Sequence, residues 1–401
     1  MRLPYKLFKL IFMMAILAGI LLITDVNRLN TPEEISKQYL FSILDWELRR
    51  LPAKWSYKIK SIIAKDHQTK STQLENIYSY FDPKRDDLDK SSLLDVEASF
   101  ERVISDAIKL EGITYFNKII FPPVSISLDS APYVLITSPR NKIVRGDEAL
   151  LKSNLSVQQA IDIENRLLKQ ENLSALVIPI GGIATYPVIV ANSNDLLWSL
   201  ETSAHEWLHT FLFFRPLGFN MFKSVEMHIL NETVASLAGK EIGLTAFNLL
   251  SSNNDKQIDL CKVINLQKHE PNSLFNFRNE MKETRINTEK LLSEGKIDEA
   301  ETYMKHRTLE FNANGYQIRK LNQAYFAFYG TYADSPGSIS IIGPEVEEYR
   351  SYFNSLKDFI IDISKISSYQ GFKDSLEKIK SQHLPPKGTN KNSTVIPFIC
   401  Q

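Results

Sequence analysis

Two histidines and a glutamate stand at a spacing that suits metal chemistry, because residues 205–209 are His-Glu-Trp-Leu-His. Residues four apart lie on one face of a helix, so His205 and His209 can bind one metal ion together. Glu206 is rotated by about 100° from His205 and can reach a water on that ion. The pattern predicts one Zn²⁺ per chain, with Glu206 as general base. The competing interpretation is that both histidines only form hydrogen bonds on a half-buried helix.

A catalytic zinc site needs a third protein ligand and one open position for water. The extended pattern HExxHxxGxxH is excluded, because Leu212 and Arg215 stand where its glycine and third histidine would be. A ligand on the following helix remains. The residue types alone leave three candidates there, Glu226, His228 and Glu232.

The segment after the motif resembles that of the gluzincin zinc metallopeptidases, in which HExxH is followed by a helix carrying a glutamate ligand in an Asn-Glu-x-x-Ala context. Residues 231–235, Asn-Glu-Thr-Val-Ala, match that context. The resemblance implies that Glu232 is the third ligand and that the small Ala235 lets the two helices approach closely. Thermolysin-like relatives carry an aspartate four residues past the glutamate, where this chain has Ser236. Support for a zinc histidine is therefore expected from elsewhere.

The resemblance covers residues 175–239 and extends to the substrate. In gluzincins a sheet edge before the HExxH helix pairs with the substrate backbone, and residues 180–186 would supply it here, unless they form an ordinary hairpin. Gluzincins also use a tyrosine or histidine from a later helix as oxyanion donor. Tyr325 and Tyr329, which share a helical face, are the candidates for that role, with core packing as the alternative. Arg319 is a weaker candidate for binding a substrate carboxylate; otherwise it is a surface charge.

The hydrophobic periodicity predicts the elements that position these residues. We expect helices from Ser193 or Asn194 to about Phe214 and over 221–239, and a hairpin of strands 175–180 and 183–190. The remaining predictions are helical spacing over 31–110 and 156–170, strands 119–128 and 133–137, helices 274–293, 297–312 and 316–329, and two more between 344 and 382.

These elements together predict an α+β, zincin-like fold. In it a small mixed sheet packs on the HExxH helix and the glutamate-ligand helix, and a mainly helical C-terminal subdomain follows. The expected organisation is an N-terminal segment 1–25, a helical lead-in 26–110, a catalytic core 111–255, a helical subdomain 256–384 and an extended tail 385–401.

The composition argues against several classes of binding partner and site. Lysine plus arginine number 47, as do aspartate plus glutamate, and no basic run is interleaved with aromatics, so a nucleic-acid partner is not expected. The chain has no P-loop and hence no expected nucleotide site. Cys261 and Cys400 lie far apart without CxxC spacing, which indicates neither a disulfide framework nor a cysteine metal site.

The N-terminus has a targeting signature. Arg2, Lys6 and Lys9 precede the uncharged run 10–24, and no small-x-small cleavage site follows it. The pattern predicts an uncleaved transmembrane signal anchor, with the catalytic part outside the cytoplasm. Secretion after signal cleavage is the alternative.

The sequence therefore predicts a membrane-anchored zinc metallopeptidase that acts on peptide or protein substrates. Two alternatives remain: a catalytically silent zincin-fold binding protein, and a zinc hydrolase of a non-peptide amide. The intact Glu206 favours an enzyme over a silent protein, since a silent protein does not need the base.

Overall fold

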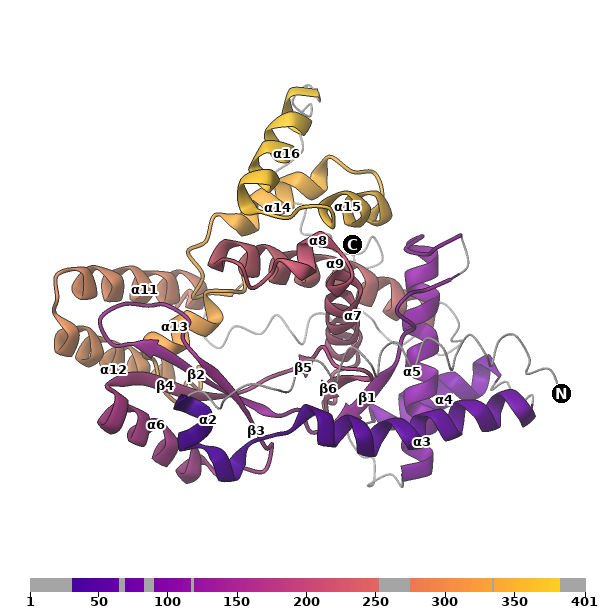
Figure 1. Ribbon diagram of the computed structural model, residues 1–401, viewed down its shortest axis with the longest axis horizontal. Coiled ribbons are helices and arrows are strands. Elements are labelled where there is room, and N and C mark those ends of the chain that lie inside the picture. Colours follow the sequence, from indigo (N-terminus) through magenta and orange to yellow (C-terminus); the bar gives the residue numbers. More distant parts are fainter. Residues whose placement is uncertain are drawn as a thin grey trace.

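A computed structural model describes residues 31–64, 69–82, 90–116, 119–251, 275–333 and 335–382. Within these ranges the chain is mainly helical and contains two three-stranded sheets, so it is a mixed α+β protein (Figure 1). The zincin-like assignment stays a prediction. In chain order the elements are α2 (Thr31–Ile35), the 3-10 helix η1 (Lys37–Tyr39), α3 (Ile43–Ala64), α4 (Lys70–Tyr80), α5 (Lys90–Leu110), β1 (Ile126–Asp129), β2 (Tyr133–Pro139), β3 (Glu148–Leu151), α6 (Val157–Glu171), β4 (Leu173–Pro179), β5 (Gly182–Ile183), β6 (Val188–Ala191), α7 (Leu196–Phe213), α8 (Pro216–Phe219), α9 (Val225–Ser251), α11 (Phe277–Ser293), α12 (Ile297–Ala313), α13 (Gln323–Tyr329), α14 (Ile342–Ser351), α15 (Leu356–Ile363) and α16 (Tyr369–Gln382).

The antiparallel sheet, with strand order β3-β2-β4, is buried on both faces. Alternate residues of β2 point to opposite faces. Leu135 packs in the cluster formed with α2 and α6, whereas Val134 and Ile136 pack against α13. Burial on both sides explains why these strands are near-continuous apolar runs in the sequence.

The second sheet, with order β1-β6-β5, packs next to α7. Strands β1 and β6 are parallel, and β5 runs antiparallel to β6. The predicted hairpin of residues 175–180 and 183–190 is therefore wrong. Its first half is β4, which pairs with β2 over seven residues in the other sheet, and its second half contains β5 and β6. Both halves pair with buried strands distant in the sequence, β4 with β2 and β6 with β1, and not with each other.

The outer edge of β1 is covered by side chains of α5. The backbone N–H of Leu128 donates to Glu97 at 3.0 Å, and that of Ile126 donates to Glu101 at 2.9 Å. Lys54 of α3 pairs with both carboxylates, at 2.9 and 2.7 Å. Burial alone would raise the pKa of Glu101, but this lysine and a neighbouring one lower it to about 2. With the β1 edge covered in this way, β5 is the opposite edge of the same sheet.

Helices α7 and α9 pack closely because small residues of α9 face α7. Ala235 is fully buried, and a Cβ added at Gly239 would lie 3.0 Å from the backbone of His205. Gly243 approaches the backbone of α7 in the same way. Gly239 is therefore not the helix end that we predicted: α9 continues beyond it, and this glycine allows close helix contact instead. At its other end, α7 is capped by Asp195, not by Ser193 or Asn194.

Helix α13 begins seven residues later than predicted, because Asn322 caps it by accepting a hydrogen bond from the N–H of Tyr325. In the extended stretch before the cap, Arg319 pairs with the buried Glu164 and donates to the Val177 carbonyl at 3.0 Å. Arg319 is therefore an exposed residue, as the alternative interpretation had it, but its charge is paired and not free to bind a substrate carboxylate. It joins this stretch to α6 and β4.

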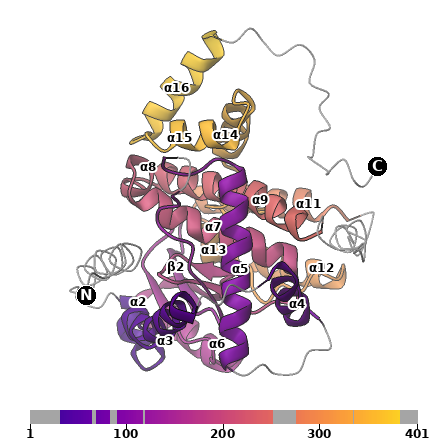
Figure 2. The same ribbon diagram turned by 90° about the vertical axis from the view of Figure 1, so that its right-hand side faces the viewer.

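Three helices, not two, occupy the end of the described chain. Helices α14, α15 and α16 lie together at one end of the molecule and contact α9 (Figures 1 and 2). Val346, Phe359 and Phe372 are fully buried in the large core that also contains α5, α7 and α9. These C-terminal helices therefore support the far side of α9.

The prediction of a transmembrane signal anchor is not supported, because no helix among the described residues is long and apolar enough to cross a bilayer. The predicted segment, residues 1–25, itself lies outside the described residues, as do Cys261, Cys400 and the tail 385–401.

Candidate metal centre

Helices α7 and α9 bring three predicted ligands together. The Nε2 atoms of His205 and His209 lie 3.0 Å apart. Oε2 of Glu232 lies 3.5 Å from the first and 3.4 Å from the second. The three side chains form the group of potential metal ligands found among the described residues. Three donor atoms thus converge on one point between the two helices.

This triangle fits a tetrahedral zinc ion. Zinc binds histidine nitrogen and carboxylate oxygen at about 2.0–2.2 Å, so tetrahedral geometry separates any two ligand atoms by roughly 3.3–3.5 Å. The two separations from Glu232, 3.5 and 3.4 Å, fall within this range, and the 3.0 Å between the histidines is somewhat shorter. Oε2 of Glu232 is also buried without a hydrogen-bond partner. A buried carboxylate oxygen of this kind is costly unless a cation satisfies it.

The charges of the three groups are strongly coupled. Burial would raise the pKa of Glu232, but the two imidazoles hold it well below its usual value. Burial would lower the pKa of His209, but the carboxylate of Glu232 raises it to about 9. The carboxylate of Glu232 and the imidazole of His209 thus stabilise each other's charged forms.

Both histidines are oriented by neighbours on α9. Nδ1 of His209 lies 2.9 Å from Oδ1 of the fully buried Asn231. Since that oxygen only accepts, Nδ1–H donates and Nε2 keeps its lone pair for a metal. Ser236 Oγ lies 3.4 Å from Nδ1 of His205. Asn231 is therefore a residue other than Ser236 that orients a metal-binding histidine, as we expected. Ser236 adds a weaker contact to the other histidine.

Glu206 is buried beside the edge strand β5. A Cβ added at Gly182 would come within 2.8 Å of both Cγ and Oε1 of Glu206, so only glycine leaves room for the carboxylate there. Burial raises the pKa of Glu206; the two histidines oppose that shift and Glu232 adds to it. The predicted base thus lies next to β5, the edge strand of its sheet.

The two competing ligands lie outside the triangle. Nε2 of His228 is 3.9 Å from Oε1 of Glu232, and it lies 3.1 Å from the guanidinium of Arg145. Since a guanidinium only donates, it uses the lone pair that a metal would need. Burial and Arg145 also lower the pKa of His228. Glu226 borders a separate cavity. The geometry favours Glu232 as the third ligand.

Arg145 is a residue near the site that the sequence analysis missed. It lies on the connection between β2 and β3, forms a two-point ion pair with Glu148 and donates to Thr331 at 3.2 Å. Its charge and Glu232 interact, since the carboxylate contributes to raising the pKa of Arg145. No sequence pattern marks this arginine, because its contacts with His228 and Thr331 join segments more than 80 residues apart.

The tyrosines after position 322 differ in their interaction with the metal centre. Tyr325 and Tyr329 lie in tilted contact with ring centroids 4.5 Å apart, and both pack, as Tyr332 does, against the cluster that the antiparallel sheet forms with α13. Tyr332, three residues further on, is close enough to the metal centre that Glu232 and Glu206 add to the effect of burial in raising its pKa. Neither carboxylate affects the pKa of Tyr325 or Tyr329, so we prefer Tyr332 to the two predicted tyrosines as the candidate oxyanion donor. It belongs to the same aromatic segment but lies beyond the helix on which the prediction relied.

Comparison of the chain with protein-family models, with curated proteins and with solved structures finds no match in any of the three. The likeness to gluzincins thus stays a prediction from the residues of the motif.

Proposed function

We propose that this chain is a zinc-dependent hydrolase that cleaves peptide bonds. The proposal depends mainly on one observation, the three donor atoms of His205, His209 and Glu232 within 3.0–3.5 Å of one another. The adjacent buried Glu206 supplies the further group that hydrolysis requires.

Each residue of the site has a separate role in the proposed hydrolysis. A bound zinc ion supplies a Lewis acid that polarises the scissile carbonyl and activates a water. Glu206 accepts the proton of the attacking water and passes it to the leaving amine. The hydroxyl of Tyr332 donates a hydrogen bond to the negative charge that develops on the carbonyl oxygen. Asn231 and Ser236 hold the two histidines in orientation.

A peptide is the favoured substrate because of the sheet edge beside Glu206. Strand β5 lies at one edge of its sheet, and Gly182 on this strand touches Glu206. An extended substrate can add to such an edge through main-chain hydrogen bonds. The opposite edge, at β1, is already occupied by side chains of α5. Addition at β5 would place a substrate amide next to the base.

The test is cleavage of a mixed peptide library by the zinc-loaded full chain, read by mass spectrometry. We expect defined cleavage products that disappear with a zinc chelator and fall about 10²–10⁴-fold in Glu206→Gln. Glu201→Gln, the same chemical change on the same helix, is the matched control and should retain activity. Zinc-loaded protein that cleaves no peptide would contradict the peptidase proposal. Hydrolysis of other amides by the same preparation would then favour a non-peptide substrate.

A further inference from the structure

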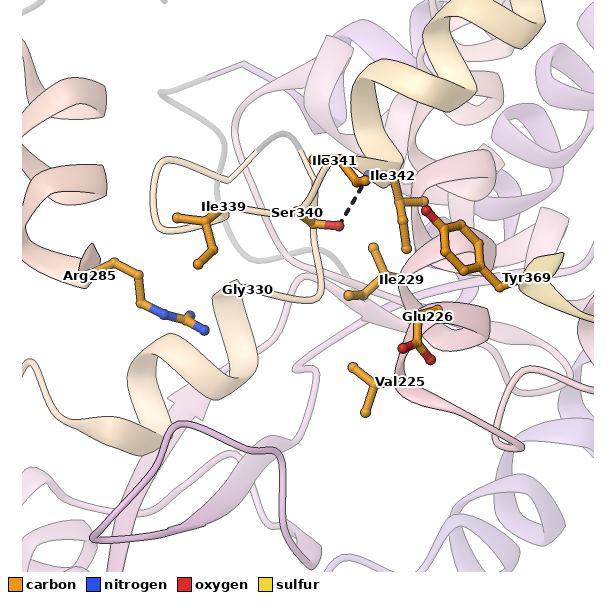
Figure 3. A pocket seen from close by; sticks show the side chains of 10 residues that line it. All are labelled: Val225, Glu226, Ile229, Arg285, Gly330, Ile339, Ser340, Ile341, Ile342 and Tyr369. Atoms are coloured by element: carbon orange, nitrogen blue, oxygen red, sulfur yellow. Dashed lines mark hydrogen bonds between the residues drawn. The ribbon is translucent and has the colours of Figure 1, made fainter. Parts of the chain in front are cut away.

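A cavity of about 380 Å³ lies between the first turns of α9 and the connection from α13 to α14 (Figure 3). Its lining is mainly apolar: Val225 and Ile229 come from α9, and Ile339 and Ile342 come from the opposite wall. Val225 is 56% exposed and Ile339 is 39% exposed, so apolar surface at this cavity faces solvent. Its size is within the range of small-ligand sites, about 300–1,000 Å³.

The cavity is separate from the metal centre, since none of the three ligands lines it, but it shares helix α9 with Glu232. Val225 and Ile229 precede Glu232 by seven and three residues and therefore share its face of the helix. At 1.5 Å per residue they lie about 4–11 Å from the ligand along the helix axis. An extended peptide advances about 3.3 Å per residue, so this distance corresponds to roughly one to three substrate residues. Gly330, on the opposite wall, directly precedes the segment that carries Tyr332.

The charged groups of the cavity favour a neutral ligand. The guanidinium of Arg285 is paired with Glu289 at 2.7 Å and donates to the Phe326 carbonyl at 2.8 Å. It therefore forms part of the wall, with its charge already compensated. The exposed carboxylate of Glu226 borders the same cavity and would repel an acidic side chain.

We propose that this cavity is a specificity pocket, which binds a large apolar side chain of the substrate within three residues of the scissile bond. Burying such a side chain against Ile229 and Ile342 stabilises the bound substrate through the apolar area removed from water. The inference depends on the proposed peptidase function, and it adds the class of residue that the enzyme selects.

The test compares zinc-loaded wild type with Val225→Glu and Ile339→Glu, which place a charge in the pocket from two independent elements. The substrates are two peptides that differ at one position, the position within three residues of the scissile bond where wild type prefers an apolar side chain. One peptide has leucine there and the other has alanine. For the leucine peptide, kcat/KM should fall about tenfold or more in each variant. For the alanine peptide it should stay within about twofold, and zinc content should not change. Leu309→Glu, at an exposed apolar position on α12, is the control for the change itself.

Four outcomes would overturn the inference, and they differ from one another. Wild type that cleaves peptides without an apolar preference within three residues of the bond excludes a specificity pocket. Unchanged leucine preference in both variants places the preference elsewhere. A zinc-loaded wild type that cleaves no peptide removes the proposed function, and the pocket assignment with it. Loss of zinc or of alanine-peptide cleavage in both variants would show that these residues support the fold, which also contradicts the inference.

Discussion

Replacing Asn231 tests how the second helix supports the metal centre. Oδ1 of Asn231 lies 2.9 Å from Nδ1 of His209, and the side chain is fully buried, so water cannot easily replace it. Loss of a partner that orients a metal-binding histidine typically lowers metal affinity by about 10–100-fold. We expect Asn231→Ala to weaken zinc binding by that factor, or about 1.4–2.7 kcal/mol. Ser236 Oγ is 3.4 Å from Nδ1 of His205, near the limit of a hydrogen bond. Ser236→Ala should therefore cost less than about threefold.

The assay is competition for zinc with a chromophoric chelator at constant pH, with thermal unfolding of the metal-free proteins to confirm that each variant is folded. Asn231→Asp is the matched control. It keeps an acceptor opposite Nδ1–H and should retain zinc affinity within a few-fold, because a charged acceptor makes the stronger hydrogen bond. The reasoning is refuted if the alanine and aspartate variants lose affinity equally, or if Ser236→Ala loses more than Asn231→Ala.

Three further predictions address the base, the oxyanion donor and the covered sheet edge. Tyr332→Phe should lower kcat by about 10²–10³-fold with zinc content unchanged, whereas Tyr329→Phe should change kcat less than about threefold; equal effects would contradict the preference for Tyr332. Gly182→Ala should lower kcat/KM by about 10–100-fold without loss of zinc, because the added methyl would lie 2.8 Å from Glu206 Oε1. The pKa of Glu101 in the folded protein, about 2, is below its usual value of 4.5, so its stabilisation is present above pH 5 and is lost as the pH falls toward 2. Urea unfolding should show a loss of about 3 kcal/mol over that range, reduced in Glu101→Gln; identical pH profiles for the two proteins would exclude this role.

The placement of the ligand residues could be predicted because it depends on local geometry. A spacing of four on a helix brings His205 and His209 to one face whatever the rest of the chain does. The third ligand required more than spacing, because Glu226, His228 and Glu232 all lie on α9. The Asn-Glu-x-x-Ala context selected Glu232, and the distances agree with that selection.

The predictions that proved wrong, and the site residues that were missed, depend on contacts between residues distant in the sequence. The strands before and after Gly181 look like a hairpin locally, but each finds its main partner in a different sheet. Gly239 looks like a helix stop, yet it serves the close contact with α7. Arg145 and Tyr332 approach the metal centre through the tertiary fold, so no local pattern identifies them. Helices can thus be predicted from neighbouring residues, whereas the partners of strands and the residues that surround the metal ligands cannot.

The most direct test of the central claim is the zinc content of the purified full chain beside that of Glu232→Ala, measured by mass spectrometry after metal-replete dialysis. His228→Ala and Glu226→Ala serve as controls on the same helix. The account predicts about one zinc per chain in wild type and in both controls, and a sharp loss in Glu232→Ala. Wild type without zinc, or Glu232→Ala that keeps it while a control loses it, would contradict the account.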